Sequence, residues 1–300
     1  MLKFEPISIK DKSRLSDILG CKNCIHTESS FNVLFTWGEV FNTQVAYENS
    51  LAFIKSTAGG VDFYQMPWGN NDLRLAIETI YTDAKARGDI LRLTSVTECM
   101  KDRLEKMLPG AFEFCENRDI FDYVYSSEDM ITLAGRSFHQ KRNNINKFNK
   151  LFEGRWEYSP ISENDLDEVY AFQLQWLEKN STEEKKNSLT DEMKVIRRIF
   201  DNYTELGYSG GMIRVDGKIC AYTVGSKVRD NAMIISLEKA DVDYPGIYQV
   251  INREFAEKNC GDIEYINRED DAGSEGLRRA KLSYNPKLLI KKYIAECKSL

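Results

Sequence analysis

The stretch SGGMIRVDGKICAYTVGSKV, residues 209–228, is the part of the sequence that indicates the fold most directly. Apolar and polar residues alternate on both sides of Asp216-Gly217. Alternation with a period of two is typical of half-buried strands, and Asp-Gly is a preferred pair in a two-residue hairpin turn. We therefore predict a β-hairpin with strands at Ser209–Val215 and Lys218–Val228.

The segments on either side of this hairpin continue an alternation of strands and helices. A basic helical segment at 133–152, a strand at 156–159 and helices at 163–178 and 191–207 are predicted before it. A strand, a helix, a strand and a helix are predicted after it, at 232–237, 246–259, 263–267 and 274–284. Hairpin, strand, helix, strand, helix is the order found in GNAT-type acyltransferases.

The first half of the chain has a similar predicted order. A helix is followed by a hairpin around Glu48-Asn49-Ser50, then by a strand, a helix, a strand, a helix and two strands. Two copies of one α/β unit with mixed sheets are the implied fold class, that is, two tandem GNAT-like acyltransferase domains. We expect domains at 1–126 and at 127–300, the second including basic linker helices at 127–152.

Length and composition agree with two domains. The chain has 300 residues, of which 42% are hydrophobic and 11% aromatic, enough for each half to bury a core. No apolar run approaches the ~18 residues of a membrane span, and the first residues do not resemble a secretory signal. We therefore expect a cytoplasmic protein without a transmembrane segment.

The charge of the chain is unevenly distributed. A net charge of −6 argues against a general nucleic-acid binder. Residues 136–155 nevertheless hold six Lys or Arg and one acid, and residues 276–292 hold six and no acid. Such segments can bind phosphates or can be solvated helix faces.

The cysteines and histidines disfavour two kinds of site. Seven cysteines are scattered, and Cys21 and Cys24 form a CxxC pair near His26. A structural zinc site usually takes four ligands, so we expect free thiols in a reducing compartment and no metal site. Two histidines and the absence of a GxSxG motif disfavour a Ser-His-Asp hydrolase.

Three longer stretches resemble a known family. They are FHQKRNNINKF (138–148), ISLEKADVDYPGIYQVINREFA (235–256) and YINREDDAGSEGLRRAKLSYNP (265–286). Together they resemble uncharacterised bacterial proteins related to the C-terminal domain of phosphatidylglycerol lysyltransferases, a tandem GNAT-like family similar to the Fem peptidyltransferases. The resemblance implies transfer of an amino acid from aminoacyl-tRNA to a lipid headgroup. We expect this chain to have no counterpart of the membrane-spanning flippase part of those enzymes.

The loop at 239–246, KADVDYPG, departs from a CoA-binding GNAT. Such enzymes usually carry Q/R-x-x-G-x-G/A here, whose backbone N–H groups bind pyrophosphate at a helix N-terminus. This loop has one glycine, two aspartates and a proline. It therefore speaks against CoA and fits either aminoacyl-tRNA as donor or a lost donor site.

Three residues are candidates for acyl-transfer chemistry. Glu238, at the end of the strand before this loop, is a candidate base or a group that orients the acceptor amine, with an ion pair as the alternative. Lys239 is a candidate for polarising the acyl carbonyl. Tyr284 is a candidate leaving-group acid, with core packing as the alternative.

Charged residues near the C-terminus form a candidate substrate site. Arg268, Arg278 and Lys281 are expected to bind a phosphate-bearing substrate. Glu269 and Asp270 are expected to hold these cations in place. A structural ion-pair network that locks the last helix to the sheet is the alternative.

The head of the basic helix is a second candidate contact. Lys141, Arg142 and Asn143 are expected to touch tRNA or a phospholipid, because Lys and Arg supply most of the affinity for phosphate. Docking of the two domains is the alternative.

Together these features predict an aminoacyltransferase with no tightly bound cofactor. Its donor is expected to be aminoacyl-tRNA or, as an alternative, acyl-CoA. The acceptor is a lipid headgroup, a peptide or another amine or hydroxyl. A CoA-dependent N-acyltransferase and a non-catalytic GNAT-fold binding or regulatory module remain the other two hypotheses.

Overall fold

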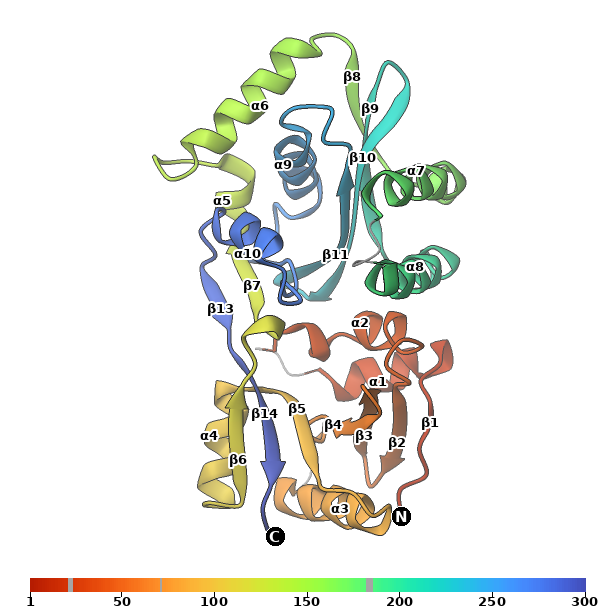
Figure 1. The fold of residues 1–300 in the computed structure, drawn as a ribbon, viewed down its shortest axis with the longest axis vertical. Helices are drawn as coiled ribbons and strands as arrows, with labels where there is room; N and C mark the ends of the chain where they lie inside the picture. The colour runs from red at the N-terminus through yellow and green to blue at the C-terminus, as the bar shows by residue number, and fades with distance from the viewer. Residues whose placement is uncertain (21–23, 71, 182–185) are drawn as a thin grey trace. The chain divides into compact units, whose positions relative to one another are not determined.

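The computed structural model describes residues 1–20, 24–70, 72–181 and 186–300. The chain forms two compact units (Figure 1). Unit 1 comprises residues 1–122, 270–275 and 289–300, and unit 2 comprises residues 123–269 and 276–288. The described residues form two seven-stranded sheets.

The sheet of unit 1 has the strand order β1-β2-β3-β4-β5-β14-β6. Its strands are β1 (Glu5–Pro6), β2 (Gln44–Glu48), β3 (Leu51–Ala58), β4 (Val61–Tyr64), β5 (Arg92–Thr97), β6 (Phe112–Glu116) and β14 (Lys292–Cys297). Its longer helices are α1 (Lys12–Ile18), α2 (Phe31–Thr36), α3 (Leu73–Ala86) and α4 (Glu98–Met107). The predicted hairpin is confirmed, since β2 pairs with β3 and both Asn49 and Ser50 have a positive φ.

Helix α3 shows how the local sequence produces an element of this unit. The Asp72 carboxylate accepts a hydrogen bond from the Arg74 backbone N–H at 2.9 Å and caps the helix N-terminus. The apolar residues of α3 recur at helical spacing and are buried. Gly88, with φ +79°, follows the helix end, where a left-handed residue is common.

Strand β14 brings the end of the chain into unit 1. It lies between β5 and β6 and pairs antiparallel with both. The sequence led us to expect residues 127–300 in one domain, whereas residues 270–275 and 289–300 lie in unit 1. The physical reason is that β5 and β6, which are far from β14 along the chain, supply hydrogen-bond partners for both of its edges. A local sequence pattern does not show such a pairing.

The sheet of unit 2 has the strand order β13-β7-β12-β11-β10-β9-β8. Its strands are β7 (Asp122–Ser126), β8 (Trp156–Pro160), β9 (Ser209–Val215), β10 (Lys218–Arg229), β11 (Ala232–Ala240), β12 (Tyr265–Asn267) and β13 (Leu288–Ile290). The hairpin at Asp216-Gly217 is confirmed, because Val215 pairs with Lys218 and both turn residues have a positive φ. Strands β11 and β12 are parallel.

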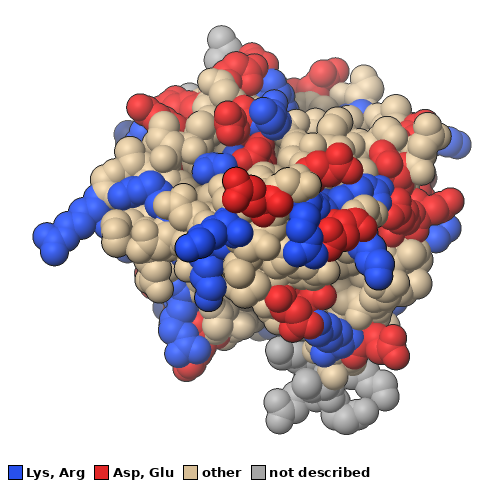
Figure 2. Space-filling model, turned by 90° about the horizontal axis from the view of Figure 1, so that it is seen from above, with Lys and Arg blue, Asp and Glu red and all other residues tan. Residues whose placement is uncertain are grey.

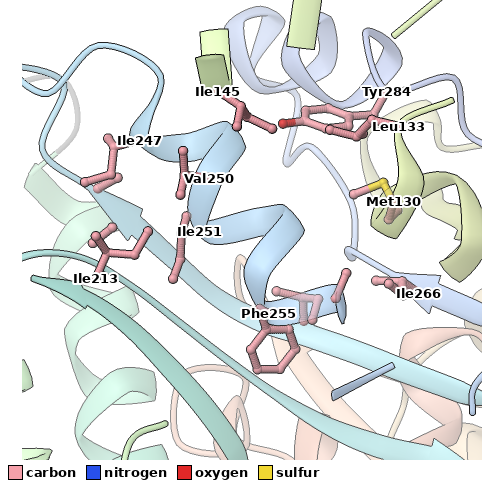
Figure 3. Close-up of a cluster of buried hydrophobic side chains, with 14 of the residues drawn as sticks. Met130, Leu133, Ile145, Ile213, Ile247, Val250, Ile251, Phe255, Ile266 and Tyr284 are labelled. Carbon is pink, nitrogen blue, oxygen red and sulfur yellow. The ribbon is translucent and has the colours of Figure 1, made fainter. Parts of the chain in front are cut away.

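Helices cover both faces of this sheet (Figure 1). Helices α5 (Ser127–Thr132), α6 (His139–Leu151), α9 (Ile247–Asn259) and α10 (Glu275–Leu282) lie on one side, and α7 (Leu166–Asn180) and α8 (Lys186–Asp201) on the other. The core under α9 gathers Val250, Ile251 and Phe255 against Ile213 of β9 and Ile266 of β12 (Figure 3). No helix within the described ranges is long and apolar enough to cross a bilayer.

Candidate functional site

Glu238 and Arg268 meet at one edge of the sheet of unit 2. Glu238 lies near the end of β11, and Arg268 directly follows β12. Because these strands are parallel neighbours, their carboxyl ends open at the same edge, where ligands commonly bind in α/β sheets. The Arg268 guanidinium donates to Glu238 Oε1 at 2.7 Å, and each side chain is 13% exposed.

Two tyrosines enclose this ion pair. The Arg268 guanidinium lies 5.8 Å from the ring centre of Tyr125 and 5.2 Å from that of Tyr284. Burial raises the pKa of the Tyr284 hydroxyl above its ordinary value, although Arg268 opposes the rise. The hydroxyl therefore stays protonated at neutral pH. Tyr284 is also part of the hydrophobic core, which agrees with the packing alternative (Figure 3).

Two lysines add positive charge beside the tyrosines. The Lys141 ammonium lies 3.9 Å from the centre of the Tyr284 ring and donates to Ser283 Oγ at 2.6 Å. Burial, reinforced by the charge of Arg268, lowers the pKa of Lys141 to about 8. Lys281 Nζ donates to the Arg268 carbonyl oxygen at 2.7 Å. Among the described residues, no carboxylate lies within 4 Å of the Lys141 ammonium.

Asn252 joins this group from α9 and was not predicted from the sequence. Its Nδ2 donates to Glu238 Oε2 at 2.9 Å, and the residue is 7% exposed. A signal was present in the sequence, because Asn252 is a polar residue among the apolar positions Val250, Ile251 and Phe255 of that helix. We call Glu238, Arg268, Asn252, Tyr284 and Lys141 the Glu238 cluster.

Lys239 lies on the other face of the sheet. It donates to Glu192 Oε1 of α8 at 2.6 Å and lies 4.3 Å from the ring centre of Trp176 of α7. Successive strand residues point to opposite faces, so Glu238 and Lys239 cannot turn into one site. The structure does not bring Lys239 to the Glu238 cluster.

Arg142 and Asn143 also lie outside the cluster. Arg142 donates to the carbonyl oxygens of Leu133 and of Gly135, the latter at 2.8 Å, and so holds the segment before α6. Asn143 is exposed and contacts His139 at 3.3 Å. Of the three residues predicted at the head of this helix, the structure brings Lys141 to the cluster.

Glu269 and Asp270 belong to the chain segment that follows β12, and Arg278 lies in α10. The Glu269 backbone N–H donates to Asn267 Oδ1, and Asp270 Oδ1 accepts from the Ala272 N–H at 2.9 Å. Asp270 falls in unit 1, whereas Glu269 and Arg278 fall in unit 2. The carboxylate bound to the Arg268 guanidinium is that of Glu238.

The N-terminus of α9 is covered by other groups. Lys179 of α7 binds the carboxylates of both Asp241 and Asp243 in the preceding loop. Gly246 has a φ of +94°, and a Cβ placed on it would lie 2.3 Å from the Asn144 carbonyl oxygen of α6. A pyrophosphate at this helix terminus would meet two carboxylates and the backbone of α6.

A second charged cluster is buried in unit 1 and was missed from the sequence. Lys292 of β14 has no exposed side-chain surface and lies 2.7 Å from both Asp122 and Glu28. It also donates to Thr27 Oγ1 at 2.8 Å. Burial opposes the charge of Lys292, but the two carboxylates outweigh it and raise its pKa. The Lys292 ammonium and the two carboxylates are paired with one another. We therefore interpret this cluster as an ion-pair network that stabilises the fold.

Metal binding has few possible ligands here. Within the described ranges no group of three or more His, Cys, Asp or Glu side chains is arranged to hold a metal ion. Of the CxxC pair, Cys21 lies outside the described residues.

Sequence comparison connects the chain with one family. The family described as "Phosphatidylglycerol lysyltransferase, C-terminal" matches residues 24–296. An uncharacterized protein of Mycoplasmoides gallisepticum is 26% identical over 179 residues, which cover 58% of this chain and 56% of that protein. The chain thus spans little more than half the length of that curated relative.

Solved structures agree with the fold. A conserved protein of unknown function from Bacteroides thetaiotaomicron has a TM-score of 0.94 and 33% identity, covering 99% of this chain and 100% of that chain. L-PGS from Bacillus licheniformis has a TM-score of 0.67 and 15% identity, covering 99% and 93%. A tandem GNAT protein from the clavulanic acid biosynthesis pathway has a TM-score of 0.51 and 10% identity, covering 100% of both chains. The predicted tandem GNAT-like α/β fold is confirmed.

Proposed function

The chain belongs to the phosphatidylglycerol lysyltransferase C-terminal family, and from this membership we propose that it is an aminoacyltransferase. It would move an aminoacyl group from aminoacyl-tRNA to an amine or hydroxyl of a lipid headgroup or peptide. The Glu238 cluster is the observation that carries this proposal. It places a carboxylate, a protonated phenol and two cations at one sheet edge.

The chemistry requires a nucleophile, a proton acceptor and a proton donor. The acceptor nitrogen or oxygen attacks the ester carbonyl carbon, a new C–N or C–O bond forms, and the bond to the tRNA ribose oxygen breaks. Because Arg268 neutralises Glu238, we assign the carboxylate to orienting the acceptor and stabilising the positive charge that develops on it. The Tyr284 hydroxyl is the candidate proton donor to the leaving oxygen, and the proton that the acceptor releases restores the hydroxyl.

The surplus of positive charge supports a phosphate-bearing substrate. Arg268 and Lys141 contribute two cations against the carboxylate of Glu238 in this cluster. A phosphate would supply the missing negative charge, and cations in a half-buried site attract it more strongly than they would in water. Arg278 and Lys281 of α10 are the proposed outer contacts of the same phosphate.

The covered N-terminus of α9 favours aminoacyl-tRNA over acyl-CoA as donor. CoA enzymes with this fold use that terminus for pyrophosphate, whereas here Asp241, Asp243 and the Asn144 carbonyl oxygen surround it. An aminoacyl ester needs no pyrophosphate site. Since aminoacyl-tRNA is a cytoplasmic donor, we propose that the protein acts in the cytoplasm.

The test uses purified protein and a tRNA pool charged with labelled amino acids. Vesicles containing phosphatidylglycerol and a peptide pool are offered separately as acceptors. We expect label to leave tRNA faster than by spontaneous hydrolysis and to appear in one acceptor fraction. Release at the background rate together with transfer from an acyl-CoA pool would contradict the proposal. Failure of both donors would favour a binding module.

A further inference from the structure

Lys141 of α6 combines partial burial with the lack of a carboxylate partner. Its Nζ donates to Ser283 Oγ at 2.6 Å and lies 3.9 Å from the centre of the Tyr284 ring. Among the residues that the structure describes, none of the carboxylates lies within 4 Å of this nitrogen. An ammonium that is withdrawn from water and lacks a carboxylate is stabilised less, so it gives up its proton more readily.

The Ser283 hydroxyl leaves the lone pair of this nitrogen available. The hydroxyl donates to the Ala280 carbonyl oxygen at 2.6 Å, so its own proton is already in use. Its oxygen therefore accepts a hydrogen bond from Lys141 and does not donate one. When Lys141 loses a proton, a remaining N–H still donates to Ser283, and the lone pair of the nitrogen stays free. A neutral amine held in this way is a nucleophile.

Lys141 reaches this neutral form close to neutral pH. Burial, reinforced by the charge of Arg268, lowers the pKa of Lys141 to about 8. Arg268 is itself paired with Glu238, and burial keeps the Tyr284 hydroxyl protonated, so neither group supplies a negative charge to Lys141. Ser283 is exposed, so a reagent can approach the amine from the side of the solvent.

Cations beside Ser283 favour a reagent that carries a phosphate. Arg279 is exposed and lies in the last turn of α10, four residues before Ser283. Residues 276–292 hold six Lys or Arg and no acid. Such a segment attracts phosphate, and phosphate bound to an acyl carbon is also a good leaving group.

We propose that Lys141 is a modification site that takes an acyl group from an acyl phosphate. The Nζ lone pair attacks the acyl carbonyl carbon, a C–N amide bond forms, and the C–O bond to the phosphate breaks. Inorganic phosphate leaves with the electron pair of that bond, and the amine proton passes to water. The acyl phosphate is the only co-reactant. This modification is independent of the proposed transfer reaction.

Acylation of Lys141 would change the charge of the Glu238 cluster. An acylated lysine carries no charge, so the cluster would lose the cation that is not balanced by Glu238. Binding of a phosphate-bearing substrate would weaken, and acylation would down-regulate the site. This consequence rests on the proposed function, in which that cation attracts the phosphate of the substrate.

The test is acetylation of the full chain by acetyl phosphate, followed by mass spectrometry of its peptides. At roughly pH 7.5 an amine with a pKa of about 8 is about one quarter neutral, against on the order of 0.1% for an ordinary lysine. The lower basicity of the amine offsets part of this advantage. Lys147, an exposed residue of the same helix, is the internal reference. We expect Lys141 to be acetylated about tenfold faster than Lys147 or more, and equal rates would overturn the modification site.

Arg279→Gln tests the class of donor. We expect it to slow acetylation of Lys141 by acetyl phosphate about twofold or more, and to leave the reaction with the uncharged N-hydroxysuccinimidyl acetate unchanged. Lys258→Gln removes one positive charge from the exposed side of α9 and is the matched control, which should change neither reaction. An equal effect of the two variants on the reaction with acetyl phosphate would overturn the phosphate-bearing donor.

Sulfate titrations test the effect of acylation on the cluster. The acetylated natural protein should lose as much affinity for sulfate as Lys141→Gln, whereas Lys141→Arg should keep its affinity after the same treatment. Near-UV circular dichroism checks the fold of each protein. Sulfate binding that is absent from the unmodified protein, or unchanged by acetylation, would overturn this effect. Acetylation at Lys141 without label transfer from tRNA would sink the aminoacyltransferase and leave the modification site standing.

Discussion

At the scale of single residues, Glu238 is held by a donor on each carboxylate oxygen. Arg268 binds Oε1 and Asn252 binds Oε2. Replacing Glu238 by Gln preserves the shape but removes the charge that we propose orients the acceptor, so we expect transfer to fall by about 10²-fold or more. The rate of label transfer from aminoacyl-tRNA measures the effect, with thermal unfolding recorded in parallel.

Glu257→Gln, a change on the exposed side of α9, is the control for this variant. It should leave the rate unchanged. Full activity in Glu238→Gln would remove Glu238 from the mechanism.

We expect Lys141 to make the proposed binding of an anion depend on pH. Burial and the charge of Arg268 lower its pKa to about 8, so Lys141 is charged below that pH and loses its proton above it. We expect affinity for sulfate, whose own charge is constant in this range, to fall as the pH rises through about 8. Lys141→Arg keeps its charge and should remove this pH dependence. Isothermal titrations with sulfate, about one for each pH unit between roughly pH 6 and pH 10, measure this dependence.

An affinity that is flat with pH in the natural protein would show that Lys141 does not contact the anion. The same conclusion would follow if Lys141→Arg kept the inflection.

Lys292 is the residue whose loss should damage unit 1 most. Lys292→Met removes the ammonium that lies 2.7 Å from the buried Asp122 carboxylate, and we expect a loss of about 3–5 kcal/mol in the free energy of unfolding. Adding Asp122→Asn to this variant should recover part of the loss. Urea denaturation measures the free energy of unfolding of the single and the double variant. If Lys292→Met lost no more stability than the exposed control Lys298→Met, the buried ion pairs of Lys292 would not stabilise unit 1.

The same cluster predicts the direction of acid destabilisation. Burial would raise the pKa of Glu28, but Lys292 and His26 outweigh it and hold the pKa well below its ordinary value. A lowered carboxylate pKa contributes stability above the unfolded value and loses it as the pH falls. The acid sensitivity of the Lys292→Met protein should therefore be smaller than that of the natural protein.

At the scale of elements, the start of α9 depends on one glycine. Gly246 combines a positive φ with a close approach to the Asn144 carbonyl oxygen of α6. Gly246→Ala should destabilise the protein by about 2 kcal/mol or more, because the left-handed backbone and the contact both oppose a Cβ. Gly261→Ala is the matched control, since nothing lies within 4 Å of a Cβ there.

Urea denaturation of the two variants decides this point. Equal stability of Gly246→Ala and Gly261→Ala would mean that α6 does not press on the start of α9. The structural argument against pyrophosphate at that terminus would then be weakened.

Some elements can be predicted from local sequence, whereas the pairing partners of others cannot. The hairpin at Asp216-Gly217 and helix α9 follow from turn chemistry and from the spacing of apolar residues, both of which are local. Strand β14 has an equally ordinary sequence, yet its partners β5 and β6 lie far away along the chain. The boundary of unit 1 therefore could not be inferred from local pattern.

At the scale of the whole molecule, a net charge of −6 coexists with local groups of cations. Figure 2 shows Lys and Arg interspersed with Asp and Glu on the face seen from above. Lys147 and Lys150 of α6 are exposed. We expect tRNA to bind through such local groups and therefore to make few phosphate contacts.

The double variant Lys147→Glu/Lys150→Glu tests this expectation. Its tRNA affinity should fall, and the slope of log K against log salt should become shallower by about 1.4 to 1.8, as expected for two lost phosphate contacts. Filter binding over a range of salt concentrations measures it. Lys85→Glu/Lys106→Glu in unit 1 carries the same charge change, and an equal effect there would mean that net charge alone is responsible.

The sequence by itself determined the strands and helices around the hairpin, the tandem α/β class and the family. These depend on short-range rules, namely turn residues, periodicity and long motifs. It also singled out Glu238, Arg268, Lys281, Tyr284 and Lys141, which the structure brings to one edge of a sheet.

Only the tertiary structure decided what each of these side chains faces. It turned Lys239 to the opposite face, added Asn252 with its unpaired carbonyl, and buried Lys292 between Asp122 and Glu28. The physical reason is that burial, ion pairing and cavity lining depend on which distant segments pack together. Residues 28, 122 and 292 become neighbours through the pairing of β14 within a sheet, and no spacing along the chain encodes that contact.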